Sequence, residues 1–356
     1  APMTVTCASA VPLPSIASVT ATDACSGAVT VVHLGDAISN QICPNKYTVT
    51  RTYKATDECG NANTCSQIIT VNDDVAPVVT CPPAASVECN DEVPLPNIGD
   101  VTATDNCNGT ITITHVSDVD NQANCPKTIT RTYRATDECG NSANCVQLIS
   151  VNDQTVPDIT CPADMEMNCA SDVPAVNIAS VIATDNCGAP TVTHVSDVTI
   201  PGACVNNFQV KRTYKATDGC NNMATCTQTI TIHDDVAPTI SNCPANTTVA
   251  CEALIPAAST AGITATDNCA GTPTIVHVGD VVSDFICNNK FVITRTYKAT
   301  DACGNTVTCT QVITVNDVTG PTVTCPAPVT VTCATLVPLP SIGSVTATDA
   351  CSGAVT

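Results

Sequence analysis

Twenty-six cysteines recur along this chain in one fixed rhythm, and their spacing constrains the fold more than any other feature. Six cysteines in constant order fill each cycle of 80 to 82 residues. This density is typical of small extracellular domains whose cores are too thin to hold without crosslinks. The complete cycles are Cys81, Cys89, Cys107, Cys125, Cys139, Cys145; then Cys161, Cys169, Cys187, Cys204, Cys220, Cys226; then Cys243, Cys251, Cys269, Cys287, Cys303, Cys309.

Other landmarks repeat with the same period, so the cycle defines the predicted domains. Each cycle opens with Cys-Pro, continues through T-A-T-D-x-C and R-T-Y-[KR]-A-T-D, and closes with V-N-D or I-H-D and a short proline-bearing stretch. Whole domains are predicted at 75–153, 154–234 and 235–317, a domain lacking its first strand at 1–74, and a partial domain at 318–356. Residues 1–30 match residues 327–356 at 26 of 30 positions, so we expect a segment of a longer array of four-domain units.

Strand signals dominate every cycle. Runs rich in Thr, Val and Ile, such as 111–116, 128–136 and 145–151, are bounded by turn-forming residues, and no stretch shows a sustained helical period. This pattern predicts an all-β chain, a tandem array of immunoglobulin-like β-sandwich domains. Trp is absent, so the core is small and aliphatic, and disulfides are expected to be the main stabilising device. The short junctions predict an elongated, semi-rigid rod.

The order of motifs resembles a known family. The sequence C-P…C…A-T-D-x-C…R-T-Y-x-A-T-D-x-C-G-N…C…V-x-D is similar to the HYR (hyalin repeat) domain, in the cysteine-rich form found in long secreted proteins of Bacteroidetes. The likeness covers the whole chain, although Gly219-Cys220-Asn221 departs from the C-G-N pattern. The resemblance implies that the cysteine of each Cys-Pro pair bonds to the cysteine of the last strand. The implied pairs are Cys81–Cys145, Cys161–Cys226 and Cys243–Cys309.

The four remaining cysteines of each cycle then pair either locally or crosswise. We favour local pairs, because they close the shorter loops. This scheme leaves Cys65 and Cys325 without a partner. The sequence contains no C-x-x-C motif, which argues against a metal site at the cysteines. The local pairs are Cys7–Cys25, Cys43–Cys59, Cys89–Cys107, Cys125–Cys139, Cys169–Cys187, Cys204–Cys220, Cys251–Cys269, Cys287–Cys303 and Cys333–Cys351.

The net charge of −20 argues against nucleic acid as a partner, and no stretch predicts a membrane span. Many of the acidic residues lie where cycles end. Oxygen ligands at this density suit Ca²⁺, and V-N-D-D-V-A-P is similar to the calcium-binding linkers of cadherins. The alternative is that Asp and Asn form turns there and the chain has no cofactor. The calcium hypothesis concerns Asp73, Asp74, Asp153, Asp234, Asp235 and Asp317.

The twelve basic residues gather in the R-T-Y strand or just before it, three in each cycle. They either pair with Asp inside their own domain or form a positive stripe that bundles neighbouring rods. Each cycle also has a His followed three residues later by Asp, as at His115 and Asp118. Positions three apart on a straight strand point to opposite faces, although a turn would bring the two side chains together. A single His–Asp pair is not a site by itself and no nucleophile accompanies it, so we predict no catalytic residue.

Together these features predict a structural, non-enzymatic segment of a large extracellular or cell-surface protein. The segment would form a fibre, filament or stalk, with three disulfides in each domain. Its expected partners are copies of itself, either arranged end to end alone or also bundled laterally. The alternative is an adhesin stalk or ligand-binding module, but no domain has the distinct loop insertions that would mark a binding tip.

Overall fold

The computed structural model describes residues 1–25, 27–351 and 353–355. The chain divides into two compact units. Unit 1 comprises Ala1–Asp158, Ala183–Thr191 and Ala216–Ala224, and unit 2 comprises Ile159–Ile182, Val192–Lys215 and Thr225–Thr356. Each unit contains whole junctions between consecutive repeats. We use the predicted repeats, numbered one to five, as names for the segments below.

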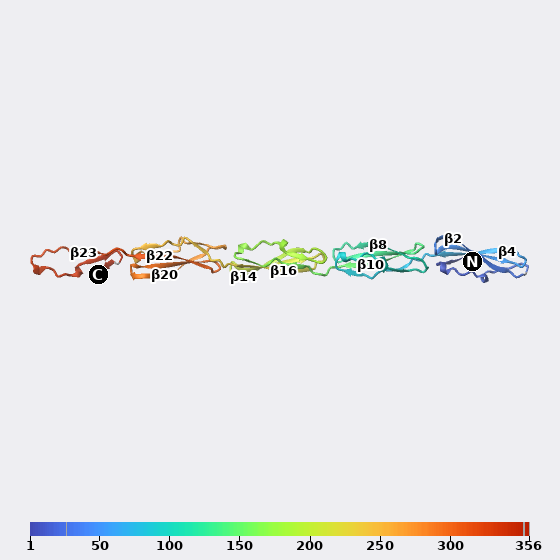
Figure 1. Ribbon diagram of the computed structural model, residues 1–356, viewed down its shortest axis with the longest axis horizontal. Helices are drawn as coiled ribbons and strands as arrows, with labels where there is room; N and C mark the ends of the chain where they lie inside the picture. The colour runs from blue at the N-terminus through green and yellow to red at the C-terminus, as the bar shows by residue number, and fades with distance from the viewer. Residues whose placement is uncertain (26, 352, 356) are drawn as a thin grey trace. The chain divides into compact units, whose positions relative to one another are not determined.

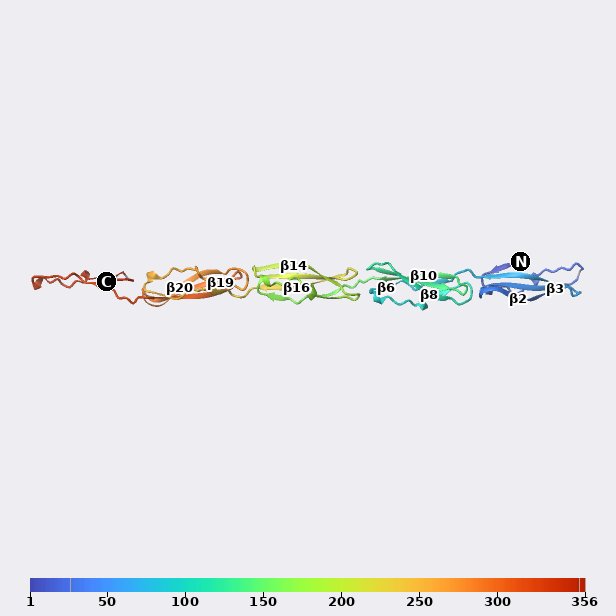
Figure 2. The same ribbon diagram turned by 90° about the horizontal axis from the view of Figure 1, so that it is seen from above.

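The second repeat illustrates the sheet plan. Strands β8 (Thr112–Asp120), β9 (Lys127–Thr136) and β10 (Ser142–Val151) form an antiparallel meander, and β6 (Ala85–Val87) adds to β10 in parallel. Figures 1 and 2 label β8 and β10, which lie on either side of β9 in this sheet. A second, two-stranded antiparallel sheet consists of β5 (Val78–Thr80) and β7 (Thr102–Thr104). Four-stranded sheets of the same order are β1-β4-β3-β2, β12-β16-β15-β14 and β18-β22-β21-β20.

The other strands keep these positions in their own repeats. In the first repeat they are β1 (Met3–Val5), β2 (Thr30–Cys43), β3 (Lys46–Thr56) and β4 (Ala62–Asn72). In the third they are β11 (Asp158–Thr160), β12 (Met165–Met167), β13 (Ile182–Thr184), β14 (Thr191–Cys204), β15 (Asn207–Thr217) and β16 (Met223–His233). In the fourth they are β17 (Thr239–Ser241), β18 (Thr247–Val249), β19 (Thr264–Thr266), β20 (Thr274–Cys287), β21 (Lys290–Thr300) and β22 (Thr306–Asn316). The last repeat contributes β23 (Thr322–Thr324), β24 (Thr346–Asp349) and β25 (Gly353–Val355).

Short 3₁₀ turns join the strands, and the described residues contain no α-helix. None of these short 3₁₀ helices is long and apolar enough to cross a membrane. The turns are η1 (Ala8–Ala10), η2 (Ile16–Ser18), η3 (Asn90–Glu92), η4 (Ile98–Asp100), η5 (Ala170–Asp172), η6 (Ile178–Ser180), η7 (Glu252–Leu254), η8 (Ala334–Leu336) and η9 (Ile342–Ser344). The prediction of an all-β chain of tandem immunoglobulin-like sandwiches is confirmed.

The R-T-Y strand supplies the centre of each sandwich. Along β9, Arg131, Tyr133 and Ala135 are buried at alternate positions, as the period of two in a strand requires. They pack with β10, in which Ile149 is fully buried. The Tyr133 hydroxyl accepts a hydrogen bond of 3.3 Å from the backbone N–H of Asn97, the residue that caps η4. The Tyr133 side chain thus fills the core and also anchors the segment that contains η4.

Candidate functional site at the repeat junctions

The cysteines at the two ends of a repeat bond to different neighbours. In the second repeat, Cys89 and Cys125 lie at one end and bond to Cys187 and Cys220 of the third repeat. At the other end Cys107 and Cys139 bond to Cys7 and Cys43 of the first. In unit 2 the same register gives Cys169–Cys269, Cys204–Cys303 and Cys251–Cys351. The bonded residues are 95 to 100 positions apart in sequence.

The predicted local pairing is therefore wrong. Cys125 and Cys139 flank β9, whose ten residues extend about 33 Å at about 3.3 Å per residue. A disulfide requires Cα atoms within about 7 Å, so the strand holds the two cysteines too far apart. The same correction applies to Cys7–Cys25, Cys43–Cys59, Cys89–Cys107, Cys169–Cys187, Cys204–Cys220, Cys251–Cys269, Cys287–Cys303 and Cys333–Cys351.

The bonds implied by the family resemblance are confirmed. Cys81–Cys145, Cys161–Cys226 and Cys243–Cys309 each join the Cys-Pro segment to the last long strand of the same repeat. Cys65 and Cys325 are unpaired, as expected. Four other cysteines that were assigned to local bonds are unpaired and exposed as well: Cys25, Cys59, Cys287 and Cys333.

Hydrogen bonds also cross each junction. Asn141 of the second repeat donates from Nδ2 to the backbone carbonyl of Asp73 in the first (3.2 Å). Asn222 does the same to Asp153 (3.0 Å), and Asn305 does the same to Asp234 (3.0 Å). Each donor follows the second A-T-D of its repeat, so the sequence repeat places one identical bond at three junctions.

Carboxylates from two repeats meet beside these bonds. Between the second and third repeats, Asp153 ends one repeat and Asp185 belongs to the T-D-x-C motif of the next, and their side-chain oxygens lie within 4.8 Å. The same approach occurs in the pairs Asp73 and Asp105, Asp234 and Asp267, and Asp317 and Asp349. Burial raises the pKa of Asp73, Asp153 and Asp234, and neighbouring carboxylates raise it further.

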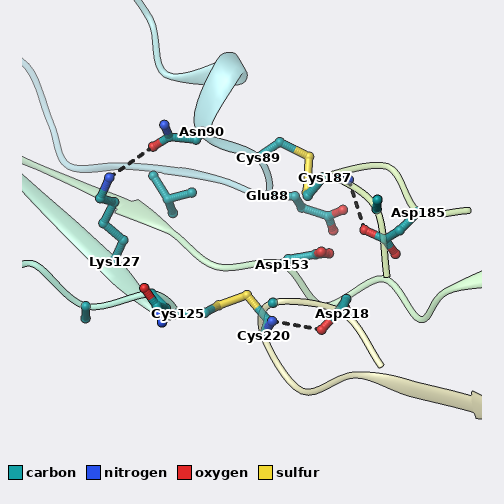
Figure 3. A pocket seen from close by; sticks show the side chains of 16 residues that line it. Glu88, Cys89, Asn90, Cys125, Lys127, Asp153, Asp185, Cys187, Asp218 and Cys220 are labelled. Atoms are coloured by element: carbon teal, nitrogen blue, oxygen red, sulfur yellow. Dashed lines mark hydrogen bonds between the residues drawn. A yellow bond between two sulfur atoms is a disulfide. The ribbon is translucent and has the colours of Figure 1, made fainter. Parts of the chain in front are cut away.

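A cavity of about 330 Å³ surrounds the pair between the second and third repeats. Figure 3 shows Asp153 between the Cys89–Cys187 and Cys125–Cys220 disulfides, with Asp185 and Asp218 beside it. Lys127 also lines the cavity, but its Nζ lies 3.1 Å from Asp120 and 3.4 Å from Asn90. The equivalent cavity beside Asp234 and Asp267 measures about 190 Å³.

The structure divides the residues of the calcium hypothesis into two sets. Asp73, Asp153, Asp234 and Asp317 lie in the junction clusters, whereas Asp74 and Asp235 are exposed and lie outside them. The hypothesis did not include the second member of each pair: Asp105, Asp185, Asp267 and Asp349. The recurrence of T-A-T-D-x-C was a visible signal, but the sequence alone does not show which loop of the next repeat meets V-N-D.

A separate polar cluster lies inside each repeat. Arg131 is 3 % exposed and donates from Nε and Nη2 to both carboxylate oxygens of Asp118 (2.9 and 2.8 Å), while Nη1 donates to the Pro94 carbonyl. His115 Nε2 lies 2.9 Å from Asp118 Oδ1. These interactions hold the pKa of Asp118 below its usual value, chiefly through Arg131. Equivalent pairs are Arg51–Asp36, Arg212–Asp197 and Arg295–Asp280.

This cluster settles two interpretations of the sequence. The arginine of each R-T-Y pairs inside its own repeat, so four of the twelve basic residues do not belong to an exposed stripe. The expectation that His115 and Asp118 point to opposite faces is wrong. A bulge between His115 and Ser117 shifts the register, so His115 lies opposite Tyr133 and Asp118 lies opposite Arg131, on one face.

Comparison with known proteins finds one family model, which matches the first two repeats. Residues 1–71 and 77–151 each match the family model of the HYR-like domain with 4 cysteines. The first two repeats are therefore HYR-like. No curated protein matches the chain. The HYR-like repeats and the dense disulfides indicate an extracellular or cell-surface module of structural or adhesion-related type.

Several solved cadherin-type structures are similar to the chain. The protocadherin gamma B4 extracellular domain is 17 % identical with a TM-score of 0.34, and the match covers 85 % of this chain and 62 % of that one. The chain thus spans less than two thirds of that relative. A protocadherin gamma B7 EC3-6 cis-dimer structure is 14 % identical (81 % and 94 % covered, TM-score 0.31). The human desmocollin-1 ectodomain is 15 % identical (92 % and 82 % covered, TM-score 0.25).

Proposed function

We propose that the chain is a structural, non-enzymatic segment of a large extracellular repeat protein that forms a fibre, filament or surface stalk. The observation that carries this proposal is that disulfides join consecutive repeats, as Cys89–Cys187 and Cys125–Cys220 do. Two such bonds prevent a repeat from swinging freely about the junction. Independent binding modules on flexible linkers would not need them. The repeats at 1–74, 75–153, 154–234, 235–317 and 318–356 are then consecutive stiff segments of one rod.

The disulfides should make the folded repeats resistant to mechanical load and to proteolysis. In the chain-entropy estimate, a bond that closes a loop of about 100 residues stabilises the folded state by about 4.7 kcal/mol, and one that closes about 65 residues contributes about 4 kcal/mol. A repeat inside the array has one internal bond and shares two with the following repeat, which makes three per repeat. The resemblance to secreted repeat proteins of Bacteroidetes suits this role.

We also propose that the array continues through the same bonds. Cys25 and Cys59 hold the positions in the first repeat that Cys107 and Cys139 hold in the second, and Cys287 and Cys333 hold those of Cys125 and Cys89. Their partners would be preceding and following repeats of the same type. Lateral bundling has less support, because the buried arginines are neutralised within their repeats.

Negative-stain electron microscopy tests the main proposal. Oxidised protein should give extended particles of uniform end-to-end length, and a reductant should broaden that length distribution as the junctions loosen. Particles that are compact, or whose length distribution is unaffected by complete reduction, would contradict a disulfide-stiffened rod. For the continuation, peptide mapping of the protein from its native source should find Cys25 and Cys59 in disulfides. Free thiols at both positions would overturn that part alone.

A further inference from the structure

Three of the junctions present a carboxylate oxygen whose hydrogen bonding is incomplete. Asp185 accepts from the backbone N–H of Cys187 through Oδ1 (3.0 Å), but its Oδ2 is fully buried and has no hydrogen-bond partner. Asp105 Oδ1 and Asp267 Oδ1 are buried and unpartnered in the same way. Among the described residues, these three account for all but one of the buried side-chain oxygen and nitrogen atoms that lack a partner. The same unpartnered oxygen recurs at the equivalent aspartate of three repeats. Because buried polar atoms in proteins are otherwise paired, this recurrence indicates a specific property of the repeat.

Each aspartate that has an orphaned oxygen lies beside a buried carboxylate of the preceding repeat. Asp153 is 5 % exposed, and Asp73 and Asp234 are 2 % and 5 % exposed. The Asp153 side chain accepts from the backbone N–H of Thr155 (3.0 Å), and no Lys or Arg pairs with it or with Asp185 at the described salt bridges. Two carboxylates within 4.8 Å, one buried and one half-buried, repel unless a proton or a cation lies between them.

The third acidic residue of each junction has a different role. Asp218 Oδ1 accepts from the backbone N–H groups of Cys220 and Asn222, and Oδ2 accepts from Asn222 Nδ2 (2.8 Å). Its hydrogen bonds hold the loop whose Asn222 reaches the Asp153 carbonyl. Asp218 therefore shapes the junction, and the Asp153 and Asp185 oxygens remain as ligand atoms.

The chemistry of this donor set selects a class of ion. The nearby sulfur of Cys187 is bonded to Cys89, so no thiolate is present for a soft metal such as zinc. Carboxylate oxygens suit hard cations, and the cavity of about 330 Å³ has room for several coordinating waters. At this junction Glu88 adds a third carboxylate near the pair (Figure 3). Glu88 accepts hydrogen bonds from Asn186 Nδ2 (3.1 Å) and Thr155 Oγ1 (2.8 Å).

We propose that the junctions bind calcium-type divalent cations through the carboxylate pairs Asp73 and Asp105, Asp153 and Asp185, and Asp234 and Asp267, with water completing the coordination. Each ion takes one carboxylate from the end of one repeat and one from the following repeat. The ion therefore adds an ionic crosslink between the two repeats, beside the two disulfides. This cation binding is a function separate from the covalent crosslinking by the disulfides. The fibre proposal does not depend on it.

Native mass spectrometry of the oxidised chain with calcium chloride counts the ions directly. Three specific ions per chain are expected, one for each pair with an orphaned oxygen. Asp153→Asn and Asp185→Asn should each remove one ion, and Asp267→Asn should remove one from a different junction. Asp235→Asn is the matched control, because Asp235 is exposed and adjoins buried Asp234. It should leave all three ions.

A stability measurement separates a cation ligand from a structural hydrogen-bond acceptor. Without calcium, Asp185→Asn should raise the unfolding temperature, because it removes the repulsion between its carboxylate and that of buried Asp153. With calcium, the further rise should be smaller in this variant than in the wild-type chain, because one of the three ions is missing. A purely structural carboxylate would give a lower unfolding temperature and an unchanged calcium response. The proposal is overturned if the wild-type chain binds no ion at about 10 mM calcium, well above the roughly 1 mM affinity of weak extracellular sites. It is also overturned if Asp235→Asn lowers the ion count as much as Asp153→Asn.

Discussion

Cys125 and Cys139 stand at opposite ends of strand β9, and each is bonded to a different neighbouring repeat, Cys125 to Cys220 and Cys139 to Cys43. One strand thus connects two junctions directly. A load applied at one junction of the second repeat reaches the other through the central strand of its sheet.

Peptide mapping under non-reducing conditions should recover this register. Digestion with trypsin and a second protease should yield a peptide pair linked through Cys125 and Cys220, since these residues lie on separate loops that meet only in the folded junction. The internal Cys81–Cys145 pair serves as the control, because both pairing schemes contain it. Recovery of a Cys125–Cys139 pair from folded protein would refute the register.

Removal of the buried guanidinium should destabilise the second repeat. Arg131→Ala eliminates a bidentate ion pair with Asp118 and a hydrogen bond to the Pro94 carbonyl, so we expect a loss of about 3 kcal/mol in the free energy of unfolding. Arg134→Ala, on the exposed face of the same strand, should change it by no more than about 0.5 kcal/mol. Equilibrium urea unfolding measures both. Equal losses in the two variants would show that strand propensity, and not the ion pair, is responsible.

Acid should weaken the repeats through the same cluster. Arg131 and His115 lower the pKa of Asp118 in the folded state, and the aspartates at 36, 197 and 280 behave alike. A lowered folded pKa means that the stabilisation is complete above the unfolded value of about 3.9 and is lost as the pH falls through the folded pKa. The unfolding midpoint in urea should therefore decline below about pH 4. The decline should be smaller in the Asp118→Asn variant than in the control Asp91→Asn, because Asp91 is exposed. A decline of the same size in both variants would exclude Asp118 as a contributor to the acid sensitivity.

The core tyrosine should contribute through its hydroxyl as well as its ring. The Tyr53 hydroxyl accepts from the backbone N–H of Ser15 at 3.3 Å, and the side chain is 3 % exposed. Tyr53→Phe keeps the packing but leaves that N–H without its acceptor, so a loss of about 1 kcal/mol is expected. Half-buried Tyr47 on the same strand supplies the control as Tyr47→Phe. Thermal unfolding of the two variants should differ, and indistinguishable curves would contradict the role of the hydroxyl.

Local features of this chain follow closely from sequence, whereas the contacts between repeats do not. The run 128–136 predicts β9 to within one residue, because its alternating Thr, Ile, Tyr and Ala match a half-buried strand. That strand also excludes a Cys125–Cys139 bond once its length is considered. A preference for short loops led to the wrong pairing, since it treats the intervening chain as flexible. The second carboxylate of each cluster escaped prediction because Asp153 and Asp185 are 32 positions apart and only the folded junction brings them together.

The paired disulfides also change what a single cut in the backbone can do. Between the second and third repeats, the main chain, Cys89–Cys187 and Cys125–Cys220 provide three separate covalent paths. Hydrolysis of one peptide bond in the exposed segment around Gln154 leaves two of these paths intact. The two repeats thus stay covalently connected after a single cut in the backbone. Severing it at such a point requires a protease and a reductant acting at the same place.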